Sequence, residues 1–107
     1  MRPRQMITLE MIENRNKYMV LVSNLTGVPV DDIMSNQQTD SISQARHLTM
    51  WALVTQCGYS HTQTGVLMRR HNTSVTYAVT HITRGYNGKV LEKYKNKIIE
   101  YHKEGEK

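Results

Sequence analysis

Phenylalanine is absent from this 107-residue chain, which has only one cysteine, Cys57, and two prolines. A single cysteine excludes an internal disulfide framework and a cysteine-based zinc site. Cys57 lies in a mostly apolar stretch, which favours a small buried side chain over a nucleophile. Without phenylalanine, the core must be built from aliphatic residues, tyrosine, the single tryptophan Trp51 and seven methionines. So many methionines favour a soft, adaptable interior.

Long apolar runs are also missing from the chain. No segment approaches the roughly 20 apolar residues that a membrane-spanning helix needs. The basic start, Met1 to Arg4, is followed by no apolar signal segment. We therefore expect a cytoplasmic protein with no membrane partner. A length of 107 residues indicates a single domain with a modest core.

The patterns that catalysis and metal binding need are not found either. There is no glycine-rich phosphate loop, no nucleophile elbow and no pair of carboxylates in an apolar context. His61, His71 and His81 are spaced by ten residues, and none has a ligand partner one helical turn away. The sequence therefore predicts a protein that is not an enzyme and that holds no metal or cofactor.

The net charge is +5, which favours an acidic partner, and nucleic acid is the commonest such partner. The alternative is that the charge serves only solubility, because the C-terminal tail carries much of the excess.

The apolar residues recur at helical spacing, and no strand pattern is present. The predicted fold class is all-α, with about six helical pieces in one domain. We expect helices at about 8–26 before Gly27, at 31–34, at 41–57 before Gly58, at 60–68, at about 72–86 and at 89–102. A polar loop is expected at 35–40 and a frayed tail at 103–107.

Two of these helices have informative faces. The segment 41–57 is apolar on most sides, so it should be the central, buried helix, with Trp51 in the core. The last helix carries an apolar stripe, which we expect to pack on the domain, against the N-terminal helix. A homodimer contact is left open for the same stripe, which consists of Val90, Tyr94, Ile98 and Tyr101.

Residues 58–82 predict a helix, a tight turn and a second helix. Ser60 and Gln63 form a capping-box pattern at the start of the first helix. Gly65 lies inside that helix, where it costs about 1 kcal/mol relative to alanine, so we expect another helix to approach it closely. The second helix opens with polar side chains and then buries an apolar face. A DNA-reading helix-turn-helix needs such a helix, held by its inner face, with its first turn offered to base edges.

Four segments of the chain also resemble a known family: VDDIMS at 30–35, ARHLTMW at 45–51, SHTQTGVLM at 60–68 and RHNTSVTYA at 70–78. They are similar to the short turn, the A-R-x-x-A-M-Y-L-like helix, the S-x-x-x-I-G-x-x-F segment and the R-D-H-[ST]-T-V-x-x-A signature of the C-terminal DNA-binding domain of the bacterial replication initiator DnaA. The resemblance covers a core of about residues 20–85. It implies a Trp-repressor-like helix-turn-helix fold, and a stand-alone relative without the family's ATPase domain.

The chain departs from the family pattern at two places. The Asp-His pair of the signature becomes His71-Asn72, and asparagine can read an adenine edge with two hydrogen bonds. The family's basic loop, whose arginine enters the minor groove, becomes NQQTD at 36–40. We therefore expect an altered base preference and no arginine contact from this loop.

The first candidates for DNA contact surround the turn. Asn72, Thr73 and Ser74 are expected to contact bases or backbone, although one of the three should cap the second helix instead. His71 is expected to reach a base or a phosphate. Arg69 and Arg70 should face phosphates, which position a protein without specifying sequence; the alternative is a solvated basic turn.

Further candidates come from the flanking helices. The resemblance implies that Arg46 touches the DNA backbone, and the alternative is an ion pair on the helix surface. Tyr77 and His81, one turn apart, are expected to extend the contact surface. Ser60, Thr62 and Thr76 complete the predicted set. The predicted function is sequence-dependent binding of double-stranded DNA in transcription or replication control. The alternative is a protein interaction module that kept the fold and lost DNA binding.

Overall fold

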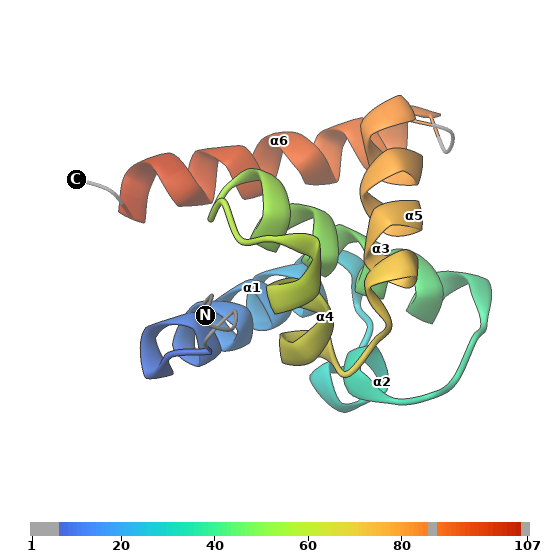
Figure 1. The fold of residues 1–107 in the computed structure, drawn as a ribbon. Helices are drawn as coiled ribbons and strands as arrows, with labels where there is room; N and C mark the ends of the chain where they lie inside the picture. The colour runs from blue at the N-terminus through green and yellow to red at the C-terminus, as the bar shows by residue number, and fades with distance from the viewer. Residues whose placement is uncertain (1–6, 86–87, 106–107) are drawn as a thin grey trace.

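The computed structural model describes the backbone of residues 7–85 and 88–105, and the side chains of 7–85 and 91–105. The described chain forms six helices and no strand (Figure 1). In order they are α1 (Leu9–Thr26), α2 (Val30–Met34), α3 (Asp40–Thr55), α4 (His61–Met68), α5 (Asn72–Arg84) and α6 (Gly88–Gly105). The prediction of an all-α fold is confirmed.

Local capping explains the ends of α1. The Thr8 hydroxyl accepts a hydrogen bond from the Met11 N–H at 3.2 Å, which satisfies one of the free donors of the first turn. Gly27 ends the helix in the left-handed region, with φ of 81°, where glycine has no Cβ penalty. Both ends lie within a residue of the expected bounds.

The bounds of α3, α5 and α6 differ from the prediction. Helix α5 ends at Arg84, and the expected end near Tyr86 lies outside the described residues. Helix α3 begins at Asp40, one residue early, and ends at Thr55 rather than Cys57. Helix α6 continues to Gly105, so residues 103–105, which were expected to fray, are helical. Val90, a predicted member of the apolar stripe, lies outside the described side chains. The last two residues of the expected tail lie outside the described backbone.

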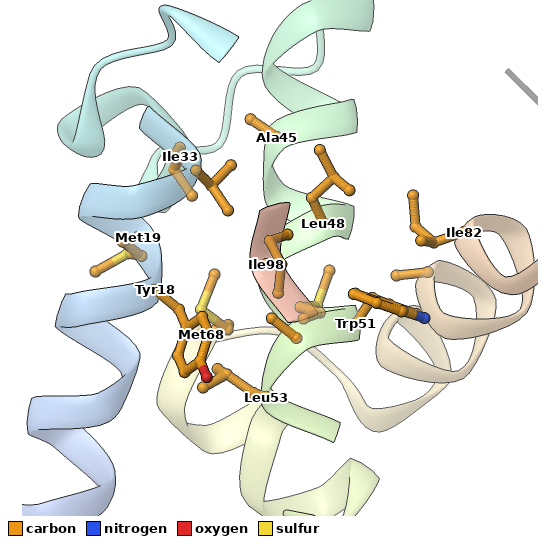
Figure 2. Packing of buried hydrophobic residues seen from close by; sticks show 14 of the residues in the cluster. Tyr18, Met19, Ile33, Ala45, Leu48, Trp51, Leu53, Met68, Ile82 and Ile98 are labelled. Carbon is orange, nitrogen blue, oxygen red and sulfur yellow. The ribbon is translucent and has the colours of Figure 1, made fainter. Parts of the chain in front are cut away.

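Helix α3 is the centre of the fold and packs against α1, α2, α4 and α5. Its buried side chains include Leu48, Trp51 and Leu53, which belong to one buried cluster with residues of the five other helices (Figure 2). Trp51 is therefore a core residue, as expected, with the Lys95 ammonium 5.8 Å from its ring centroid. A helix buried on most sides holds its neighbours at defined angles, because close-packed interiors resist deformation.

Helix α6 packs on α1, as the sequence predicted. Ile98 is fully buried, and the Tyr18 hydroxyl lies 2.6 Å from Nδ1 of His102. In the view of Figure 1, α6 runs along one side of the molecule and α2 lies on the opposite side. None of the described helices has the length and apolar character needed to cross a bilayer.

Candidate nucleic-acid interface

Helix α4 begins with a complete capping box. The Ser60 hydroxyl accepts from the Gln63 N–H at 3.0 Å, and the Gln63 side-chain oxygen accepts from the Ser60 N–H at 3.0 Å. This pattern was read from the sequence and is confirmed. Thr62, the second residue of the helix, is exposed. The entry into the helix-turn-helix is therefore defined by local hydrogen bonds.

The turn between α4 and α5 is tight because its main chain contacts Gly65. The Arg70 N–H donates to the Gly65 carbonyl at 2.8 Å. A Cβ atom at Gly65 would lie 2.7 Å from the Arg70 main-chain oxygen, closer than real Cβ contacts come. Arg69 makes the reversal in the left-handed region, with φ of 57°, at a cost of about 1–2 kcal/mol for a residue with a side chain. A close approach to Gly65 is present, but the turn at Arg70 makes it, and not a second helix as was expected.

Helix α5 is capped by His71, not by any of the three residues expected. Nδ1 of His71 accepts from the Thr73 N–H at 3.3 Å. The prediction that Asn72, Thr73 or Ser74 would cap is wrong, because α5 begins one residue earlier than those side chains require. All three belong to the first turn of the helix and are exposed. Their side chains are therefore not used to cap α5, which was the alternative to contact with a partner.

The two faces of α5 are clearly separated. Val75, Ala78 and Ile82 are fully buried, and α5 packs closely on α3 and α4. The side chains of Thr76 and Tyr77 lie on the exposed side, continuing the surface of the first turn. The helix is therefore held by its inner face and offers a polar outer face to a partner.

His61 links the start of α4 to this outer face. Its Nδ1 lies 2.7 Å from the Thr76 hydroxyl, which also donates to the Asn72 carbonyl at 3.1 Å. From the sequence, His61 was weighed only as a metal ligand, because spacing along the chain cannot show this contact. Among the described side chains, no group of three or more His, Cys, Asp or Glu residues is arranged to hold a metal ion.

An aromatic cluster of His47, Tyr77 and His81 lies beside the outer face of α5. The Tyr77 and His81 rings stack with centroids 5.6 Å apart and an interplanar angle of 13°. The His47 ring, from α3, meets both at 67°, at 5.6 Å from Tyr77 and 5.9 Å from His81. The sequence predicted Tyr77 and His81 as a contact surface and missed His47.

The aromatic cluster forms one wall of a hollow between α3 and α5. The hollow measures about 540 Å³ and is lined by Asp40, Ser41, Ser43, Gln44, His47, Tyr77 and His81. Burial, together with the neighbouring His81 and Arg46, lowers the pKa of His47 to about 4. His47 is therefore uncharged at neutral pH.

Arg46 is a structural residue in this fold and not a surface cation. Its side chain is only 5% exposed. Its guanidinium donates to the carbonyl oxygens of Ile33 at 2.8 Å, Ser35 at 2.7 Å, Gln37 at 3.0 Å and Asp32 at 3.3 Å. This geometry differs from the expected contact with the DNA backbone and from the alternative surface ion pair. Arg46 instead ties the end of α2 and the loop that follows it to α3.

Arg69 and Arg70 both lie at the turn, but their side chains differ in exposure and in hydrogen bonding. Arg69 is exposed. The Arg70 guanidinium donates to the Asn36 side-chain oxygen at 3.1 Å and to the Ser35 carbonyl, so it braces the loop after α2. Neither arginine forms an ion pair with a carboxylate within the described part of the chain. Their charges are therefore not neutralised by the protein itself.

A third arginine, Arg15, lies close to Arg69. It donates from Nη1 to the Leu67 carbonyl at 2.9 Å, near the C-terminal end of α4. Burial and the nearby Arg69 charge lower the pKa of Arg15. Arg15 therefore adds a cationic group beside the turn on the α1 side, and Arg70 lies on the side of the loop after α2.

The loop that replaces the family's basic segment is exposed from Asn36 to Thr39, and so is Asp40 at the start of α3. It carries no lysine or arginine. The cations near this loop that are not buried, Arg69 and Arg70, therefore belong to the turn.

A family model described as the bacterial DnaA protein helix-turn-helix matches residues 17–82, which is more than half of the chain. The matched segment begins within α1 and ends within α5, so it includes the helix-turn-helix, the loop after α2 and the aromatic cluster, but not Arg15. No curated protein and no solved structure matches the chain.

Proposed function

Because the chain belongs to the bacterial DnaA helix-turn-helix family, whose membership supports DNA binding through that motif, we propose that it reads double-stranded DNA in a sequence-dependent manner. Helix α5 enters the major groove with its first two turns against the base edges. The mechanism is binding alone: cations at the turn neutralise phosphates, and polar side chains of α5 select bases.

The observation that carries this proposal is the exposed first turn of α5. His71 caps the helix, so Asn72 and Thr73 are not needed as caps and face outward. Asn72 has the amide needed to pair with N6 and N7 of adenine. Because Val75, Ala78 and Ile82 bury the inner face of α5, the backbone that carries the outer side chains is held in place.

Arg69 and Arg70 supply the phosphate contacts. Arg69 is exposed, and the Arg70 guanidinium, with five N–H donors, retains capacity beyond the bonds to Ser35 and Asn36. The N-terminus of α5 adds a partial positive charge close to the same position. The role that we propose for this binding is occupation of a control site in transcription or replication.

A protein interaction module is the alternative function, and the exposed loop at 36–40 without cations is the observation that favours it. A duplex titration at several salt concentrations separates the two. Arg69 and Arg70 alone predict a log–log slope of about −1.8, and each further cation adds about −0.9. Arg69→Ala should reduce the slope by about 0.9, whereas Lys93→Ala, an exposed charge on α6, should leave it unchanged. Absence of binding at low salt favours the interaction module.

Sequence dependence is tested separately with Asn72→Ala. On the duplex that wild-type protein selects from a random pool, the variant should lose about 1–3 kcal/mol of binding free energy, and less on unrelated duplexes. Thr83→Ala, at an exposed position near the other end of α5, is the matched control and should keep both affinities. An equal loss on all duplexes would assign Asn72 to phosphate contact.

A further inference from the structure

Tyr77 is an unusual residue for the exposed face of a polar helix. It is the sixth residue of α5 and is 60% exposed. Its neighbours on the outer face, Thr73 and Thr76, carry small polar side chains. If α5 lies in the major groove, this aromatic ring is within the two turns that meet base edges.

The exposed ring is held in place before any partner arrives. His81 stacks on it from the next turn of α5, and His47 meets it edge-on from α3, both at 5.6 Å between centroids. Contacts from two helices restrict the side-chain torsions of Tyr77. A ring that is ordered in advance loses little conformational entropy when it binds.

The chemistry of the hollow disfavours a phosphate ligand. His47 carries no charge at neutral pH, because burial lowers its pKa to about 4. The polar lining residues Ser41, Ser43 and Gln44 are uncharged, and the carboxylate of Asp40 would repel an anion. The lining therefore does not favour an anion, while the exposed ring of Tyr77 offers an apolar surface that suits an uncharged, apolar group.

A base pair presents one apolar group in the major groove, the 5-methyl group of thymine. We propose that Tyr77, braced by His47 and His81, forms a reading site for that methyl group. The proposal rests on the proposed function, since it names the group that this part of the DNA interface recognises. Tyr77 makes the contact, and His47 acts as a positioning residue through Tyr77.

The test changes the DNA by one methyl group at a time. Wild-type protein is titrated with the duplex it selects from a random pool, and with copies in which one thymine is replaced by uracil. Burial of one methyl group predicts that at least one replacement weakens binding about fourfold. For Tyr77→Ala, the thymine and uracil duplexes should bind equally at that position.

Two substitutions at His47 test whether its ring positions Tyr77. His47→Phe keeps a ring against Tyr77 and should preserve the thymine-to-uracil ratio. His47→Ala removes the brace and should lower that ratio, and Thr83→Ala is the control that should not change it.

Sequence-dependent binding with no thymine-sensitive position would overturn this inference and leave the proposed function standing. A thymine-to-uracil ratio that survives Tyr77→Ala would also overturn it. No duplex binding at low salt would overturn both the inference and the proposed function.

Discussion

The main chain of Arg70 occupies the place where a side chain on Gly65 would lie. A Cβ atom at Gly65 would be 2.7 Å from the Arg70 oxygen, while the Arg70 N–H donates to the Gly65 oxygen at 2.8 Å. This pair of contacts brings the end of the turn against the middle of α4. It thereby sets where α5 begins, and so where Asn72 and Thr73 point.

Gly65→Ala should therefore destabilise the protein. Alanine gains about 1 kcal/mol in helix propensity, but the new methyl group meets main-chain atoms that cannot rotate away. Overpacking of this kind typically costs about 1–3 kcal/mol, so we expect a net fall in the free energy of unfolding, measured by chemical denaturation. Val66→Ala is the control, because Val66 is 59% exposed in the same helix. Equal stability of Gly65→Ala and wild type would mean that the turn can move away from α4.

His71→Ala should weaken the start of α5. Removal of the ring leaves the Thr73 N–H without its side-chain acceptor, which typically costs about 0.5–2 kcal/mol. His71→Asn restores a preferred capping side chain and should match or exceed wild-type stability in thermal unfolding. If both variants were equally destabilised, His71 would matter for something other than its cap.

Arg46→Lys should destabilise the protein although it keeps the charge. A lysine ammonium cannot reach all four carbonyl oxygens that the guanidinium joins, and each unsatisfied buried group costs about 1–3 kcal/mol. We expect a loss of that order in denaturant unfolding, with Lys93→Ala as a control at an exposed cation. A variant of wild-type stability that bound DNA less well would return Arg46 to the predicted backbone contact.

The pH dependence of stability should reveal the lowered pKa of His47. Its pKa is about 4 in the folded protein and 6.5 in its ordinary state, so the unfolded chain binds more protons between those values. Stability contributed by neutral His47 is present above pH 6.5 and is lost as pH falls toward 4. We expect wild type to lose about 1–2 kcal/mol more than His47→Phe over this range, allowing for solvent screening at a partly buried ring. Parallel pH profiles for the two proteins would contradict the lowered pKa.

Much of the fold could be predicted because its signals are local. Gly27 and the Ser60–Gln63 pair act within four residues of themselves, so the helix ends that they cap could be predicted from the sequence. Helical spacing identified α3 as the central helix, and the polar turn before Val75 identified the helix-turn-helix. The helix bounds were less accurate, because the last turns of α3 and α6 depend on packing as well as on propensity.

The site was predicted less well than the fold. Both wrong predictions concern residues whose role is set by contacts with other segments of the chain. Asn, Thr and Ser are good caps, yet His71 caps α5, because the close contact at Gly65 decides where the helix starts. Arg46 was expected on the surface, but the loop after α2 folds over it and supplies four acceptors.

The sequence by itself determined the all-α architecture, the capped helix-turn-helix and the face of α5 that is buried, since each depends on residue order over one or two helical turns. Only the tertiary structure decided which polar side chains form hydrogen bonds within the protein and which are exposed to a partner. Arg46 and Arg70 bond to a loop 9 to 35 residues away, and His47 reaches Tyr77 from another helix. Such contacts depend on how helices are placed in space, and that placement follows from burial of the whole core.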